Sequence, residues 1–246
     1  TIYQEARIAK KTIVLSDGED ERSIKAAALA VKEKLAQIIL LGNETIIYST
    51  AKKADIDLYS LGIIVIEPLK SSKKQEYADR FFKSREKKGK PVLSKEALLK
   101  MEQPLFYAGM MLLTGDADGE VGGSLSSTAD VIKAGLHTVG TPDGTKTVSS
   151  YFIMIPPDNK VIVEECVIFA DCAVVPNPNS EQLADIAVTS AKNAKKLLGL
   201  EPKVAMLSFS SKGSAVHQDV DKVTLALKIA KEKSPDLLID GEFQFD

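Results

Sequence analysis

The residues best suited to binding an anion lie in a glycine- and hydroxyl-rich stretch, residues 115–136 (GDADGEVGGSLSSTADVIKAGL). Hydroxyl residues, among them Ser124, Ser127 and Thr128, precede an apolar-periodic segment that begins at Ala129. Glycines let a backbone approach a ligand closely, and hydroxyls before an apolar run are typical of a helix N-cap. Free N–H groups and the dipole at a helix N-terminus favour negative charge. The stretch therefore predicts an anion site on a loop that leads into a helix, with an ordinary turn and a capped helix as the alternative.

A second loop, Ser210-Ser211-Lys212-Gly213, has similar potential near the C-terminal end of the sequence. Backbone amides in such a turn can form an anion-binding nest, and Lys212 adds positive charge. The alternative interpretation is a flexible, solvated loop.

Residues 70–90 form a strongly cationic segment in which Arg80 and Arg85 lie among many lysines. The segment is predicted to be mostly helical, with Tyr77, Phe81 and Phe82 as its apolar stripe. We interpret it as a positive rim for a phosphate-rich ligand. The alternative is a solvated helix face, which is the usual meaning of a charge run.

The segments that must position these loops alternate between short apolar runs and amphipathic stretches. Strands are expected at residues 11–16, 37–41 and 63–67. The first two are each followed by a predicted helix, one with Asp20 and Glu21 in its first turn and one capped by Asn43. Such alternation is typical of a parallel sheet covered by helices on both faces, so the fold class is predicted to be α/β.

A turn signal at residues 141–144 (TPDG) predicts the boundary between two α/β domains, residues 1–141 and 142–246. In the second, strands are expected at residues 147–155, 161–163, 167–174 and 203–209, and from residue 236. Helices are expected after a cap at residues 177–180 and over residues 219–233. Cys166 and Cys172 are predicted to share one strand face as buried free thiols, which fits a reducing cytoplasm.

Composition limits the classes of function that the chain can have. It has 246 residues, 44% of them hydrophobic and 27% charged, as in globular proteins. A formal net charge of −2 gives no general reason to bind nucleic acid or an anionic membrane, and no apolar run is long enough to span a bilayer. The two histidines, His137 and His217, are isolated, so no metal site is expected.

Several ordered segments resemble the phosphate acetyltransferase family, whose relatives include phosphate butyryltransferases. The match covers nearly the whole chain, and its most specific pieces are residues 17–27 (DGEDERSIKAA), 115–130, 168–187, 203–215 and 219–246. The resemblance implies the reaction acyl phosphate + CoA ⇌ acyl-CoA + phosphate, with acetyl as the expected acyl group. It implies two three-layer α/β domains with the substrate cleft between them, similar to isocitrate and isopropylmalate dehydrogenases. It also implies a homodimer that uses CoA as a substrate and has no permanently bound cofactor.

The resemblance also implies roles for individual residues. Arg85 matches a family arginine associated with the CoA phosphates, and Ser127 and Thr128 match a hydroxyl pair in the central loop. Lys133 stands where the family usually has an arginine, which keeps the charge but loses the bidentate fork. Gly122 replaces a usual serine, and Ser126 replaces a usual histidine.

In the family, CoA thiolate attacks the acyl carbonyl, an aspartate takes the thiol proton, and a serine–arginine pair holds the acyl phosphate. That pair and the aspartate lie in a C-terminal Ser-Arg-Gly segment, whereas the one Ser-Arg here is Ser84-Arg85. We therefore expect a C-terminally shortened member with an incomplete second domain, whose catalytic residues lie beyond Asp246. The alternatives are a non-catalytic module that binds CoA or acyl phosphate, and a phosphate butyryltransferase.

Overall fold

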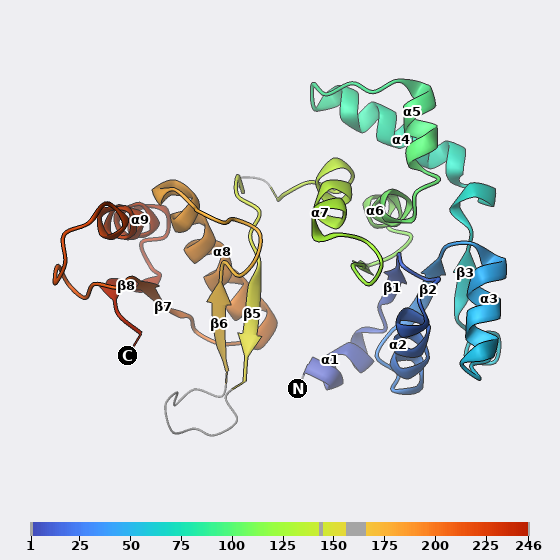
Figure 1. The fold of residues 1–246 in the computed structure, drawn as a ribbon, viewed down its shortest axis with the longest axis horizontal. Coiled ribbons are helices and arrows are strands. Elements are labelled where there is room, and N and C mark those ends of the chain that lie inside the picture. Colours follow the sequence, from blue (N-terminus) through green and yellow to red (C-terminus); the bar gives the residue numbers. More distant parts are fainter. Residues whose placement is uncertain (1, 143–144, 156–165, 246) are drawn as a thin grey trace. The chain divides into compact units, whose positions relative to one another are not determined.

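A computed structural model describes residues 2–142, 145–155 and 166–245 of the chain (Figure 1). The chain divides into two compact units, Thr1–Gly140 and Thr141–Asp246. No helix within the described ranges is both long enough and apolar enough to cross a membrane.

The first unit is built on a four-stranded, fully parallel sheet of order β3-β2-β1-β4. Its strands are β1 (Thr12–Leu15), β2 (Gln37–Leu41), β3 (Ile64–Ile66) and β4 (Gly119–Val121). Its helices are α1 (Ile2–Ala9), α2 (Glu21–Lys32), α3 (Glu44–Lys53), the 3-10 turn η1 (Pro68–Lys70), α4 (Lys74–Lys87), α5 (Ser94–Lys100), α6 (Pro104–Thr114) and α7 (Thr128–His137). The predicted α/β class is confirmed.

Strand β2 shows why the sheet is covered on both faces. Successive side chains of a strand point to opposite faces, so Ile38 and Leu40 enter one core with α2 and α3. Ile39 and Leu41 enter a second core with α4, α5, α6 and α7. The layers lie on the two sides of the sheet in Figure 1. A continuous apolar strand is the pattern that such two-sided burial requires.

Strand β4 was not expected, because the glycines around it were interpreted as loop residues. Gly119 pairs with Ile13, and a Cβ at this position would lie 2.9 Å from Ile13 Cδ1. The glycine therefore allows close packing between strands rather than a turn. Asp118 fixes the start of β4, since its carboxylate accepts hydrogen bonds from Thr12 N at 2.9 Å and Lys11 Nζ at 2.6 Å.

The described part of the second unit contains two separate pairs of strands. Strands β5 (Tyr151–Met154) and β6 (Val167–Ala170) are antiparallel, and β7 (Lys203–Leu207) and β8 (Leu238–Phe243) are parallel. Helices α8 (Ser180–Leu198) and α9 (Gln218–Lys233) share a core with β7 and β8. The strand expected at residues 161–163 lies outside the described residues.

The expected placement of the two cysteines is wrong. Strand β6 ends at Ala170, because Asp171 turns the chain by accepting hydrogen bonds from Ala173 N at 2.7 Å and Val174 N at 2.9 Å. Cys172 therefore lies beyond the strand, and its thiol donates to a backbone carbonyl. Both cysteines are free and partly exposed rather than buried.

Candidate functional site

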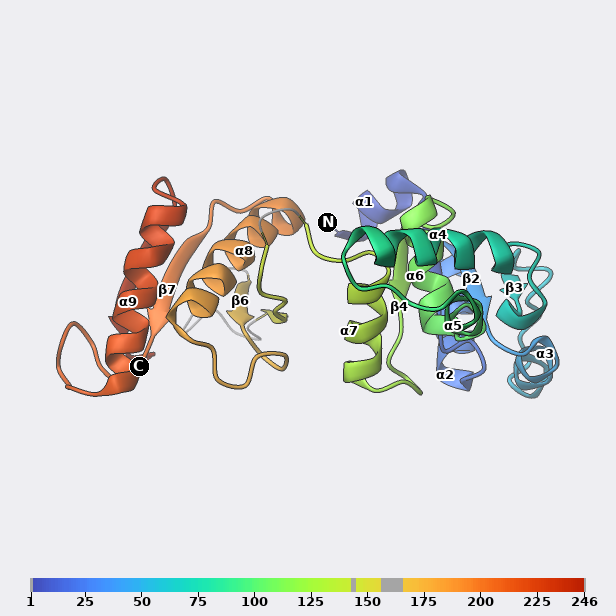
Figure 2. The same cartoon turned by 90° about the horizontal axis from the view of Figure 1, so that it is seen from above.

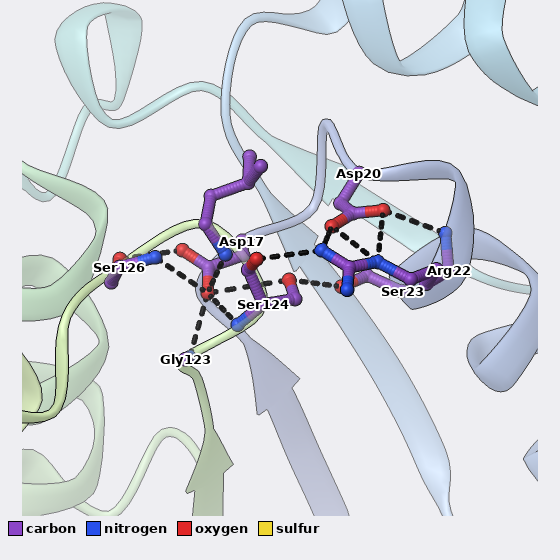
Figure 3. Close-up of polar contacts among 8 residues, drawn as sticks. Asp17, Asp20, Arg22, Ser23, Gly123, Ser124 and Ser126 are labelled. Atoms are coloured by element: carbon purple, nitrogen blue, oxygen red, sulfur yellow. Dashed lines mark hydrogen bonds and ion pairs between the residues drawn. The ribbon is translucent and has the colours of Figure 1, made fainter.

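The candidate site lies in the first unit, at the carboxyl ends of β1 and β4. These strands pair in parallel, with Leu15 opposite Val121, so the loops that follow them leave the sheet at the same edge. Ligands of open α/β sheets bind at this edge. Figure 3 shows the two loops, which contain Asp17 and Gly123.

The carboxylate of Asp17 organises the glycine-rich loop. Its Oδ2 accepts hydrogen bonds from the backbone N–H groups of Gly123 at 2.7 Å, Ser124 at 2.8 Å and Leu125 at 3.2 Å. Its Oδ1 accepts from the Ser126 hydroxyl at 2.6 Å (Figure 3). The loop amides that the sequence predicts to be free for an external anion therefore bind a carboxylate of the chain itself.

Asp17 is held in its ionised form. Burial disfavours the charge, and the side chain of this residue is almost wholly enclosed. The Ser126 hydroxyl and the loop amides, those of Gly123 and Leu125 foremost, together outweigh burial and hold the pKa of Asp17 below its ordinary value. The loop is thus a genuine anion receptor whose anion is Asp17.

Arg22 ties the same loop to helix α2. Its guanidinium donates to the carbonyl oxygen of Ser124 at 2.6 Å and forms an ion pair with Asp20 at 2.6 Å. Hydrogen bonds from Arg22 lower the pKa of Asp20 to about 2. The sequence predicted Asp20 in the first turn of α2, but the residue is instead the N-cap of this helix. The Ser23 and Ser124 hydroxyls also meet, at 3.2 Å.

Ser127 caps helix α7. Its hydroxyl accepts from Asp130 N at 3.2 Å and donates to the Asp130 carboxylate at 2.7 Å. Thr128 is the first residue of the helix. The Ser127 hydroxyl is therefore occupied in capping, which is the role that the alternative interpretation of this stretch assigned to it.

Beside the Asp17 loop lies a hollow of about 210 Å³, enclosed by helices α6 and α7 and the end of α5. It is lined by Ser16, Asp17, Lys100, Gln103, Pro104, Leu105, Phe106, Ser126, Asp130 and Lys133. The Ser16 hydroxyl is buried near the Glu120 carboxyl. A Cβ at Gly122 would lie 2.5 Å from that hydroxyl, so a larger residue here would require the Ser16 side chain to rotate.

Arg85 is buried in the first unit, with 8% of its surface exposed, so the solvated-face interpretation does not hold for this residue. Its Nε has no hydrogen-bond partner among the described residues. A buried N–H group without an acceptor carries a free-energy cost that an incoming anion would remove. Helix α6 packs against both α4, which carries Arg85, and α7, which carries Lys133 (Figure 2).

Two titratable residues of this region were not singled out by sequence reasoning. Burial raises the pKa of Glu120 to about 7, and the Asp17 charge adds to the effect. Burial lowers the pKa of His137, and nearby cations lower it further. An isolated histidine on a helix and a glutamate in a short strand give no sequence signal, because their environment comes from tertiary packing.

In the second unit, the Ser210–Gly213 loop also encloses a carboxylate of the chain. Glu242 accepts from Gly213 N at 2.7 Å and from the Ser210 hydroxyl at 3.0 Å. The ammonium of Lys212 bonds to Asp240 at 2.8 Å, and so does not point into the nest. The Ser211 hydroxyl accepts from Gln244 N at 2.8 Å.

The structure thus groups Ser124, Ser127, Thr128 and Lys133 around one region of the first unit, and Ser210 to Gly213 in the second. Sequence reasoning missed the two internal acceptors, Asp17 and Glu242. The sequence signal for each was an acidic residue directly after a predicted strand or near its end, in a chain that also contains a glycine- and serine-rich loop distant in sequence.

Comparison with known proteins gives consistent matches along the entire chain. A family model described as "Phosphate acetyl/butaryl transferase" matches residues 1–246. A phosphate acetyltransferase of Thermoanaerobacterium thermosaccharolyticum is 45% identical over 246 residues, which are 100% of this chain and 73% of that protein.

Two solved structures extend the comparison to the fold. The EutD phosphotransacetylase from Staphylococcus aureus has a TM-score of 0.85 and 38% identity, and a phosphotransacetylase from Streptococcus pyogenes has a TM-score of 0.86 and 33% identity. Each match covers 100% of this chain and 73% of the other.

Proposed function

The chain belongs to the phosphate acetyl/butyryl transferase family, and from that membership we propose that it is a phosphate acetyltransferase. It interconverts acetyl phosphate plus CoA and acetyl-CoA plus phosphate. The CoA thiolate attacks the acyl carbonyl, the bond from that carbon to the phosphate oxygen breaks, and phosphate leaves. Acetyl phosphate and CoA are both anionic, so their binding requires positive charge that is not already neutralised by the protein.

The observation that best supports this function is the buried Arg85 side chain, whose Nε has no hydrogen-bond partner among the described residues, in the same unit as a hollow lined by Lys100 and Lys133. Many cations of the first unit are neutralised locally, as Arg22 is by Asp20 and Lys73 by Asp116. Arg85, Lys100 and Lys133 have no ion-pair partner among the described residues, so their charge is available to a ligand.

We assign the CoA phosphates to Arg85 and Lys133. A guanidinium can bind two phosphate oxygens at once, while an ammonium acts as a compact charge at the mouth of the hollow. Ser124, Ser127 and Thr128 shape the adjoining loop and the start of α7. In the second unit, Ser210, Ser211 and Gly213 are proposed as further substrate contacts, in a loop that Glu242 holds in shape. Lys212 is proposed to join them by leaving its ion pair with Asp240.

The remaining expectations are part of the same proposal. The enzyme acts in the cytoplasm, where acyl phosphates and CoA are exchanged, and it forms a homodimer. It uses CoA as a substrate and needs no permanently bound cofactor. Size-exclusion chromatography with light scattering would check the dimer, and a monomer at assay concentration would remove that part of the proposal.

The function is tested by mixing acetyl phosphate and CoA with the purified chain and following the thioester absorbance. The same assay is made with the longest natural product that contains this chain, and with butyryl phosphate as a competing substrate. Thioester formation that prefers acetyl phosphate supports the proposal. CoA binding without turnover in every form would contradict it and would indicate a binding module.

A further inference from the structure

His137 lies in the last turn of α7, four residues after Lys133 and therefore on the same side of the helix. Its ring meets Phe106 edge to face, with ring centroids 6.0 Å apart. The Lys100 ammonium lies 4.5 Å from the centroid of the same Phe106 ring. Phe106, Lys100 and Lys133 all line the hollow beside the Asp17 loop, so His137 contacts one residue of this lining and lies one helical turn from another.

The groups that act on His137 are all cationic. They are Arg85 of α4, Lys90 of the segment after α4, Lys100 of α5 and Lys133 of its own helix. Neither ring nitrogen of His137 has a hydrogen-bond partner within the described ranges, so both remain available to a ligand.

Resting on the proposed function, we propose that His137 is a proton-linked contact for the phosphate groups of CoA. It is neutral in the free protein and takes up a proton when the phosphates enter. The imidazolium then donates a charge-assisted hydrogen bond to a phosphate oxygen. The C-terminal end of α7 favours a cation at this position once the neighbouring cations are neutralised.

The direction of the effect follows from linkage. Burial, and then repulsion from Arg85, Lys133, Lys100 and Lys90, lowers the pKa of His137 in the free protein. Bound phosphate neutralises those cations and raises the same pKa. Binding is therefore coupled to proton uptake, and CoA affinity falls as pH rises through the pKa of the bound state. One proton changes the dissociation constant by at most about tenfold per pH unit.

The alternative role for His137 is packing against Phe106 without any link between CoA binding and protonation. Proton NMR of the unaltered protein distinguishes these two roles. The chain has two histidines, so His217 of the second unit serves as an internal reference. In the free protein, the His137 signal should titrate below its ordinary pKa. Adding CoA should move that midpoint upward.

Calorimetry with CoA between pH 5.5 and 8 gives the second readout. The CoA phosphate monoester itself titrates near pH 6, so the informative quantity is the difference between proteins rather than the raw slope. Wild type should lose about threefold to tenfold more affinity across this range than His137→Gln. His217→Gln is the matched control and should follow wild type.

Two results would overturn the inference and leave the proposed function intact. One is CoA binding that does not move the titration midpoint of His137; the other is CoA binding with the same pH dependence in wild type and His137→Gln. A protein that does not bind CoA at any pH would overturn both.

Discussion

Replacing Asp17 tests whether an internal carboxylate builds the loop of the candidate site. In Asp17→Ala, three backbone donors and the Ser126 hydroxyl lose the acceptor that they share at distances between 2.6 and 3.2 Å. In Asp17→Asn, one carbonyl oxygen remains as an acceptor, but the charge is lost and the second oxygen becomes an N–H donor.

The magnitude follows from the number and kind of these hydrogen bonds. An unsatisfied donor costs about 1–3 kcal/mol, and the lower end applies because Gly123 and Leu125 are exposed enough for water to reach their amides. We therefore expect Asp17→Ala to lower the free energy of unfolding by about 3 kcal/mol. Charge-assisted hydrogen bonds are roughly twice as strong as neutral ones, so Asp17→Asn should lose about half as much.

The assay combines urea denaturation with hydrogen exchange. Amide protons of Gly123, Ser124 and Leu125 should be protected in wild type, less so in Asp17→Asn, and least in Asp17→Ala. Asp236→Asn is the control, because Asp236 is exposed and accepts no hydrogen bond from a described residue. Wild-type stability together with unchanged protection in both Asp17 variants would refute the claim that this carboxylate shapes the loop.

Two further predictions concern charge. Lys133→Arg should retain or improve acetyl-CoA formation, because it adds a bidentate fork at the mouth of the hollow; steady-state kinetics would check this, and a large loss would mean that the site requires a compact ammonium. Hydrogen bonds from Lys73, Tyr77 and Thr114 lower the pKa of Asp116 to about 2, so its stabilising contribution is complete above its unfolded pKa of about 4 and is lost as pH falls toward 2. Asp116→Asn should therefore be less stable than wild type at pH 7, and this difference should shrink as pH falls from 4 toward 2 in urea titrations; a difference that keeps its pH 7 size near pH 2 would contradict this account.

The elements with strong local patterns could be predicted from the sequence. Strand β2 and helix α3 agree with expectation, because a continuous apolar run and an Asn43 cap specify them locally. Strand β4 could not be recognised, since Gly119 is needed for packing against Ile13, which is distant in sequence. The cysteine placement failed for a related reason, because the hydrogen bonds of Asp171 end β6 early.

The candidate site, too, could be predicted from the sequence only in part. Residue type and order suggested two anion-binding loops, and backbone amides in both loops do bind carboxylates. That these carboxylates belong to Asp17 and Glu242 depends on strand pairing, which brings together residues far apart in the chain. The burial of Arg85 could have been anticipated, because this residue lies four positions after Phe81 and therefore on the apolar face of α4.

The central claim is that the buried guanidinium of Arg85 binds CoA phosphate, and kinetics of Arg85→Ala test it most directly. Arg85→Lys, which keeps a positive charge but loses the fork, is the matched variant. The account predicts that Arg85→Ala raises the Michaelis constant for CoA by about tenfold or more, the equivalent of one charge-assisted hydrogen bond, while that for acetyl phosphate changes much less. The Michaelis constant of Arg85→Lys for CoA should lie between those of wild type and Arg85→Ala. Equal effects on both constants, or no effect on either, would contradict the assignment of Arg85 to CoA.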